Sequence, residues 1–418
     1  MTTTQIAISQ QRPTQATSVH EPPISVALQS RIDRDFTPRW KHEWGGRFIL
    51  HGHPARPNAV HLDGNDYLSV TGHPQIVQAQ VAALTQNTEH VVQSGVFLLD
   101  QHPAHRFEQE LALWLGKADG VLCQSGYAAN VGLLQAIADA NTPVYIDSLA
   151  HASLWEGAHA ARAPAHAFRH NDPAHLERQI ARHGPGLVVV DSVYSTTGAL
   201  CPLADVVAVA EQGGCMILVD ESHSLGTHGP QGAGLCAELG LTHRVHFITA
   251  SLAKAFAGRA GYFTLPRAMR YHVLLSSFPN VFSSSLLPHE IAALSATLTL
   301  LRQSEMARER LRNITQRLRG TLRDLGYPID QGSEQIIALE AGREKDAMIL
   351  RDALETRGVI GAVFCAPATS RNRAMVRLTL NAGLTDAELD HVEAVAAEIA
   401  PLVRPWDWPI ARRARCVA

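Results

Sequence analysis

Lysine is scarce in this chain of 418 residues. The 36 basic residues include only four lysines, Lys41, Lys117, Lys254 and Lys345, and the other 32 are arginines. Long blocks of like charge are also missing, and the formal net charge is −3. Binding to nucleic acid or to an anionic membrane surface requires a concentrated basic patch, so this composition argues against both partners. We therefore expect a small-molecule ligand.

Paired cysteines, metal-binding motifs and long apolar runs are missing as well. The six cysteines form no C-x-x-C pair, which is typical of reduced thiols in a cytoplasmic protein. The 22 histidines include no H-E-x-x-H motif, so we predict no metal site. No segment approaches the ~18 continuous apolar residues of a membrane helix. We expect a cytoplasmic protein that makes no contact with a membrane.

The length of the chain predicts two domains, because a single core stops growing at roughly 250 to 300 residues. We predict a disordered leader over residues 1–24, which are rich in Thr, Gln and Pro. A segment over 25–64 is expected to pack on the smaller domain. The larger domain is predicted over 65–290 and the smaller one over 291–418.

The larger domain is predicted to be α/β, with a mainly parallel sheet flanked by helices. Apolar runs of strand length alternate with helix-like segments, and their near-continuous Val, Ile and Leu indicate strands buried on both faces. The runs are 121–123, 144–146, 187–190, 216–219, 245–248 and 261–264. Most of them end in polar residues. Because ligands of open α/β sheets bind at the carboxyl ends of the strands, we expect these residues to line one pocket.

The smaller domain is predicted to be α+β. Long helices are expected within 291–325, followed by a strand at 336–339 and a helix at 345–356. Two further strands, at 359–364 and 376–380, precede a helix from Asp386 to Ala400. Residues 26–36 are expected to complete this domain.

A lysine and a carboxylate at neighbouring strand ends indicate pyridoxal phosphate (PLP) chemistry. Lys254 follows one apolar run, while Asp220 and His223 follow another. In a PLP enzyme a lysine forms a Schiff base with the cofactor, and a carboxylate keeps the pyridine nitrogen protonated. A single lysine after a strand is more often a solvated surface amine, so this interpretation depends on the rest of the pocket.

Other strand ends offer groups that suit the same cofactor. The Ser-Gly-Tyr segment at 125–127 opens an apolar helix, and backbone N–H groups at a helix N-terminus bind phosphate. His151 could lie on the face of an aromatic ring, or it could be a buried histidine at a helix start. Asp191 and Ser195 could approach the cofactor, or they could be turn and cap residues.

Four segments, in their order and spacing, resemble the α-oxoamine synthase group of fold-type I PLP enzymes. They are SGYAAN (125–130), HASLWEG (151–157), VDESHSLGTHGPQGAG (219–234) and TASLAKAF (249–256). The similarity runs from about Asn65 to about Leu380. The group includes 8-amino-7-oxononanoate synthase, 5-aminolevulinate synthase, serine palmitoyltransferase and 2-amino-3-ketobutyrate CoA ligase. The resemblance implies fold type I, PLP as the cofactor and a homodimer with composite active sites.

Within this group the chain is most similar to the α-hydroxyketone quorum-sensing autoinducer synthases. The segments QSG (124–126), NVGLLQ (130–135) and VFCAPATS (363–370) are among those that support this likeness. The apolar stretch QSGVFLLD (93–100) replaces the Gly-Ser-rich, arginine-containing stretch of most other members. The resemblance implies a medium-chain acyl-CoA acceptor and S-adenosylmethionine or 2-aminobutyrate as the donor. 8-Amino-7-oxononanoate synthase or another α-oxoamine synthase is the alternative.

The resemblance also implies roles for individual residues. The catalytic residues would be Lys254 as the Schiff-base lysine, Asp220 at the pyridine nitrogen, His151 on the ring face and His223 near the phenolic oxygen. Further cofactor contacts would come from Ser125, Gly126, Tyr127, Ser195, Ser251 and Ser285, the last of these reaching the phosphate of the partner subunit. The substrate would contact Asn65, Thr369 and Arg377, with Arg377 binding the donor carboxylate.

Two other classes of protein are weaker alternatives. Ser251 and Lys254 fit the S-x-x-K motif of penicillin-recognising serine hydrolases, but the S-D-N and K-T-G motifs of that class do not occur. A non-catalytic binding protein of the same fold would not need Lys254, Asp220 and His223 together.

Overall fold

The computed structural model describes residues 22–86, 92–99 and 101–411, so residues 1–21 of the expected leader lie outside the described residues. The chain divides into two compact units, Met1–Phe48 and Ile49–Ala418. The first contains helix α1 (Val26–Asp35) and the π-helical turn η1 (Arg39–Glu43). In this unit Phe36 packs on Trp40 and Trp44, with ring centroids 5.9 and 5.8 Å apart. The predicted domain boundaries stay predictions.

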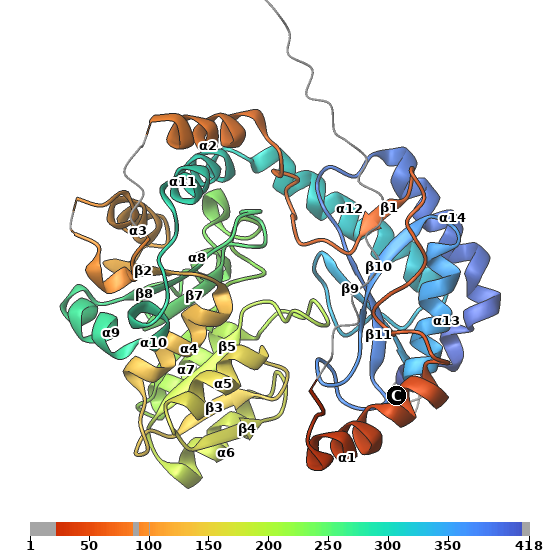
Figure 1. The fold of residues 1–418 in the computed structure, drawn as a ribbon, viewed down its shortest axis with the longest axis horizontal. Coiled ribbons are helices and arrows are strands. Elements are labelled where there is room, and N and C mark those ends of the chain that lie inside the picture. The colour runs from red at the N-terminus through yellow and green to blue at the C-terminus, as the bar shows by residue number, and fades with distance from the viewer. Residues whose placement is uncertain (1–21, 87–91, 100, 412–418) are drawn as a thin grey trace, which may run out of the picture. The chain divides into compact units, whose positions relative to one another are not determined.

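The second unit contains a seven-stranded sheet (Figure 1). Its order is β2 (Asp119–Cys123), β8 (Gly261–Leu265), β7 (Phe247–Ser251), β6 (Met216–Asp220), β5 (Leu187–Asp191), β3 (Val144–Asp147) and β4 (Ala165–Phe168). Only β8 runs antiparallel to its neighbours in this sheet. The prediction of a mainly parallel sheet is therefore confirmed.

Helices connect the parallel strands and cover a core of branched aliphatic side chains. They are α4 (Gly126–Ile137), α5 (Ala152–Ala160), α6 (Pro173–His183), α7 (Leu203–Gln212) and α8 (Leu235–Glu238). All residues of β2, β3 and β5 are buried, as expected for strands covered on both faces. Leu133 and Leu154 of α4 and α5 join Ile146 and Val189 in this core. The parallel direction places the carboxyl ends of β2, β3, β5, β6 and β7 at one edge of the sheet.

Several further helices flank this sheet in the chain: α2 (Pro74–Gln86), the 3-10 turn η2 (Gly95–Phe97), α3 (Pro103–Trp114), α9 (Arg270–Ser276) and α10 (Phe278–Val281). Of these, η2, α9 and α10 contact one another.

A second, four-stranded sheet has the order β1 (Val60–Leu62), β10 (Val359–Phe364), β11 (Ala374–Thr379) and β9 (Ile336–Gly342). β1 is parallel to β10, and the other pairs are antiparallel. The helices after Ser285 are α11 (Pro288–Arg302), α12 (Glu305–Asp324), α13 (Glu344–Glu355) and α14 (Asp386–Val403). α13 packs on all three longer strands and on α14 (Figure 1). This arrangement confirms the α+β prediction, although β1 was not predicted.

No helix among residues 22–86, 92–99 and 101–411 is long and apolar enough to cross a membrane.

Candidate active site

The predicted phosphate-binding residues lie where β2 leads into α4. Ser125 caps α4, its Oγ accepting a hydrogen bond from the backbone N–H of Ala128 at 3.1 Å. A Cβ atom on Gly126 would lie only 2.6 Å from the Cβ of Ser251, so glycine is needed for the close approach of these two loops. Tyr127 is half exposed beside them. The structure thus brings together Ser125, Gly126, Tyr127 and Ser251 at a helix N-terminus, which suits an anion.

The buried carboxylate of Asp220 ends β6. Its Oδ2 accepts a hydrogen bond from Nδ2 of Asn130 at 2.7 Å, and its Oδ1 accepts one from the backbone N–H of Ser222 at 2.9 Å. The same Asn130 nitrogen lies 2.8 Å from Oγ of Ser153, which is 2.7 Å from Nδ1 of His151. Asn130 therefore connects Asp220 to His151. Asn130 and Ser153 were not predicted as functional residues, although they lie in the segments SGYAAN (125–130) and HASLWEG (151–157).

Asp191 lies directly beside Asp220 on the neighbouring strand β5. Its Oδ1 accepts a hydrogen bond from the backbone N–H of His151 at 3.2 Å. Burial, followed by the negative charge of Asp220, raises the pKa of Asp191 well above its ordinary value. This shift favours the protonated form of Asp191.

Lys254 follows β7 and lies within electrostatic reach of the other predicted catalytic groups. Burial lowers the pKa of its amine, the positive charge of Arg377 lowers it further, and the carboxylate of Asp220 opposes both effects. Burial also lowers the pKa of His151, where Asp220 raises it and Lys254 lowers it. An amine whose pKa is lowered in this way is a better nucleophile and base near neutral pH.

His223 is buried and neutral. Burial lowers the pKa of its imidazole well below the ordinary value, and the positive charges of Lys254 and Arg377 lower it further. Its Nδ1 lies 2.5 Å from the hydroxyl of Tyr67, and its carbonyl oxygen accepts a hydrogen bond from Nε2 of Gln335 at 2.9 Å. Neither partner was predicted from the sequence as a functional residue.

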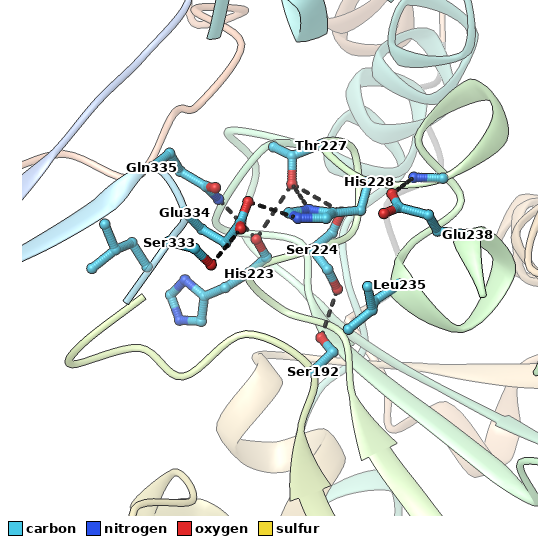
Figure 2. Close-up of polar contacts among 12 residues, drawn as sticks. Ser192, His223, Ser224, Thr227, His228, Leu235, Glu238, Ser333, Glu334 and Gln335 are labelled. Atoms are coloured by element: carbon cyan, nitrogen blue, oxygen red, sulfur yellow. Dashed lines mark hydrogen bonds and ion pairs between the residues drawn. The ribbon is translucent and has the colours of Figure 1, made fainter. Parts of the chain in front are cut away.

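Figure 2 shows that the loop after β6 is fixed by polar contacts on several sides. The hydroxyls of Ser224 and Ser192 lie 2.6 Å apart, and Thr227 donates a hydrogen bond to the carbonyl of Ser224 at 3.0 Å. Nε2 of His228 lies 3.0 Å from a carboxylate oxygen of Glu334, just before β9. The loop that carries His223 is therefore attached both to the residue that follows β5 and to a residue just before β9.

Arg377, on β11, joins two other predicted site residues. Its guanidinium donates to the carbonyl of Ser195 at 2.8 Å and to Oδ1 of Asn65 at 3.0 Å. It also lies 4.5 Å from the ring centroid of Phe364. Its Nε is buried and has no hydrogen-bond partner among the described residues. Arg377 is thus held in place by protein groups while its Nε–H remains available for an acceptor such as a carboxylate.

Thr369 and Ser285 line two other cavities. Thr369 lies at a cavity of about 280 Å³, together with Ala150 and Ala152, the neighbours of His151, and Thr196. Its hydroxyl is buried, and no group in the described part of the chain forms a hydrogen bond with it. Ser285 lines a smaller cavity, and its backbone N–H bonds to the carbonyl of Gln93. The expected roles of both residues stay predictions.

The residues present fit PLP. The N-terminus of α4 suits the phosphate, the buried carboxylate of Asp220 suits a protonated pyridine nitrogen, and Lys254 supplies the amine. The side-chain oxygens of Thr249 and Asn130 lie on or beside these elements, are buried, and have no hydrogen-bond partner within residues 22–86, 92–99 and 101–411, which leaves polar groups for a ligand. No group of three or more His, Cys, Asp or Glu side chains in the described part of the chain could hold a metal ion.

Comparison with known proteins supports this interpretation of the site. Residues 57–395 match the model of the family "aminotransferase class I and II". CAI-1 autoinducer synthase of Vibrio campbellii is 43% identical over 376 residues, which are 90% of this chain and 95% of that protein. An 8-amino-7-oxononanoate synthase of Mycobacterium sp. (strain JLS) is 30% identical over 363 residues, 86% of this chain and 94% of that one. Among solved structures, a serine palmitoyltransferase variant from S. paucimobilis, bound to a PLP–myriocin aldimine, has a TM-score of 0.83 and 26% identity. That similarity covers 90% of this chain and 99% of the other.

Proposed function

The chain belongs to the class I and II aminotransferase family, and from this membership we propose that it is a PLP-dependent acyl-CoA:amino acid C-acyltransferase of the α-oxoamine synthase type. Its product would be the α-amino ketone or enaminone precursor of an α-hydroxyketone quorum-sensing autoinducer. The observation that supports this product is the similarity to CAI-1 autoinducer synthase over nearly the whole chain.

Asp220, Lys254 and His151 each have a different role toward PLP. When bound, PLP supplies an aldehyde for covalent attachment and an electron-withdrawing pyridinium ring. Asp220, fixed by Asn130 and Ser222, would hold the proton on the pyridine nitrogen. The buried amine of Lys254, with its lowered pKa, would hold the cofactor covalently and, once the donor amine has displaced it, would accept the proton from the donor's α-carbon. His151 would lie over one face of the ring.

We propose a medium-chain acyl-CoA as the acceptor and S-adenosylmethionine or 2-aminobutyrate as the donor. Arg377 would bind the donor carboxylate, helped by Asn65 and by Thr369. A carbon–carbon bond forms between the donor's α-carbon and the acyl carbon, coenzyme A leaves as its thiol, and decarboxylation or elimination follows. The apolar residues 96–99 suit an acyl chain, since each buried CH₂ contributes roughly 0.8 kcal/mol.

A panel of acyl-CoA thioesters and amino donors tests this proposal, with coenzyme A release and product mass as readouts. We expect turnover with decanoyl-CoA and one of the two proposed donors. Pimeloyl-CoA and succinyl-CoA should react poorly, because their distal carboxylates would be buried without partners. Lys254→Ala is the control for background release. A preference for pimeloyl-CoA with alanine would instead identify an 8-amino-7-oxononanoate synthase.

We also propose a homodimer, supported by an exposed apolar surface. The elements η2, α9 and α10 contact one another, and five large residues on them or directly after α10 are exposed. We call these five residues the aromatic patch: Phe97, Tyr271, Leu275, Phe278 and Phe282. Tyr271, Leu275 and Phe282 are 74, 75 and 76% exposed. Such a cluster of large apolar side chains marks an interface, and a second copy of the chain would cover it. Ser285 lies shortly after Phe282 in the sequence, so we expect the dimer to place it near the partner's phosphate site.

Light scattering after size-exclusion chromatography tests the dimer. Phe282→Asp combined with Leu275→Asp should shift the mass towards the monomer. Met306→Asp is a matched control, because Met306 in α12 is 78% exposed but lies outside the aromatic patch. A monomeric wild-type protein, or a double variant that stays dimeric, would contradict the proposal.

A cytoplasmic location is the remaining proposal. The five cysteines in the described ranges are all buried and free, as in proteins that stay in a reducing compartment. Fractionation of cells that express the full chain tests this location.

A further inference from the structure

Tyr67 makes one side-chain hydrogen bond, and it is to His223. The side chain of Tyr67 is completely buried, and its hydroxyl lies 2.5 Å from Nδ1 of the imidazole. No other hydrogen-bond partner of this hydroxyl exists in the described part of the chain. The backbone of Tyr67 is also fixed, since its N–H bonds to the carbonyl of Asn65 and its carbonyl accepts from the N–H of Ala382.

The protonation states of this pair determine the direction of the bond. Burial raises the pKa of the Tyr67 phenol, which therefore keeps its proton, and burial lowers the pKa of His223, which is therefore neutral. A neutral imidazole has one donor and one acceptor nitrogen. If Nδ1 carried the proton, the phenol would accept it, and its own O–H would be buried without an acceptor. That arrangement is unfavourable, so Tyr67 donates and Nδ1 accepts.

We propose that Tyr67 is a positioning residue that holds neutral His223 in the tautomer with its proton on Nε2. This inference rests on the proposed function and adds a specific task for His223. With its proton on Nε2, His223 can donate a hydrogen bond to an oxygen of the cofactor or substrate, but it cannot remove a proton with that nitrogen. Lys254 then remains the base of the site.

Among the described residues, Tyr67 is the group that bonds to a ring nitrogen of His223, and it therefore selects this tautomer. The carbonyl oxygen of His223 is bonded to Gln335, and the following residues are anchored through Ser224 and His228 (Figure 2). The main chain is thus fixed without any contact to the ring nitrogens. No protein group in the described ranges bonds to Nε2, which leaves this nitrogen for a ligand.

Nitrogen NMR on the holoenzyme labelled with ¹⁵N-histidine tests the proposal directly. The His223 signals are assigned by their loss in His223→Asn. In the wild type we expect a pyridine-like shift for Nδ1 and a pyrrole-like shift for Nε2. In Tyr67→Phe these shifts should move towards an average of the two tautomers. With the substrates proposed above, kcat should fall about 10-fold while KM changes little, as for the loss of one hydrogen bond.

Tyr327→Phe is the matched control, because Tyr327 is also buried and its hydroxyl makes one hydrogen bond, to the carbonyl of Ala396. It should change neither the His223 shifts nor kcat. A wild-type His223 with its proton on Nδ1, or unchanged shifts in Tyr67→Phe, would overturn the proposal. The wild-type spectrum decides even if Tyr67→Phe does not fold. It needs no substrate, so a failed acyl-CoA panel refutes the proposed function and leaves the tautomer result intact.

Discussion

Replacing Asn130 should damage the site without removing any group that touches the substrate. Nδ2 of Asn130 donates to Asp220 at 2.7 Å and to Ser153 at 2.8 Å, and the residue is only 2% exposed. In Asn130→Ala, Oδ2 of Asp220 and the hydroxyl of Ser153 both lose this donor. The carboxylate that should face the pyridine nitrogen then becomes less well fixed.

The loss of stability and activity in Asn130→Ala follows from the two hydrogen bonds that it removes. A hydrogen bond to a charged group contributes about 1.5–3 kcal/mol, and one between neutral groups contributes about 1 kcal/mol. The free energy of unfolding should therefore fall by about 2.5–4 kcal/mol. If half of the effect, about 1.25–2 kcal/mol, reaches the transition state, kcat/KM falls about 8- to 30-fold, because about 1.36 kcal/mol corresponds to one factor of ten.

Two measurements check this prediction: unfolding by denaturant and the affinity for PLP, followed by absorbance. Asn280→Ala is the matched control, since Asn280 is also 2% exposed and its amide donates to the carbonyl of Leu122, far along the chain from Asp220. Both variants should lose stability, but only Asn130→Ala should lose affinity for PLP. Asn130→Asp should weaken PLP further, because it places a second carboxylate beside Asp220. Wild-type affinity in both Asn130 variants would refute the reasoning.

Three other outcomes follow from the site and its surroundings. Lys254→Ala should prevent covalent attachment of PLP to the protein, so that mass spectrometry after borohydride reduction finds no phosphopyridoxyl group. A phosphopyridoxyl group on Lys117 in the wild type would contradict the assignment of Lys254. Asp220→Asn should keep PLP bound but lower kcat by about 2 to 3 orders of magnitude, as other electrostatic groups do, and near-normal turnover would disprove its role. For the pair of His228 and Glu334, burial favours the neutral forms, but their mutual hydrogen bond raises the pKa of His228 and lowers that of Glu334. The stabilisation by His228 is therefore complete below the ordinary histidine pKa of about 6.5 and is lost as the pH rises through the raised pKa. His228→Gln should lower the free energy of unfolding more at pH about 5.5 than at pH about 8.5. An equal loss at both pH values would argue against the ion pair.

The strand ends of the large sheet were predictable because buried parallel strands have a strong sequence signal. The runs ending at Asp220 and before Lys254 are nearly all apolar, and their polar ends meet at one edge of the sheet, as expected. β4 was missed because it is an edge strand with the sequence Ala-His-Ala-Phe, of which only Phe168 is fully buried. β1 was missed because three residues are too few to show a period.

The hydrogen-bond partners inside the site could not be predicted in the same way. Asn130 reaches Asp220 across 90 residues of sequence, and Tyr67 reaches His223 across 156. Residue type and spacing mark Asp220 and His223 as reactive groups, but they do not specify which buried amide or hydroxyl fixes each one. Those pairings depend on how α4 and the loop after Asn65 are placed in three dimensions.

The attachment of Arg377 to Ser195 and Asn65 has a consequence for how the protein unfolds. Arg377 belongs to the four-stranded sheet, whereas Lys254 and Ser195 follow strands of the seven-stranded sheet. A ligand that contacts both Arg377 and Lys254 can bind only while the two sheets are packed together. By linkage, such a ligand at 100 times its Kd stabilises that packing by about 2.7 kcal/mol. A saturating donor should therefore make the two sheets melt in one cooperative step, so that differential scanning calorimetry reports on substrate binding without any turnover.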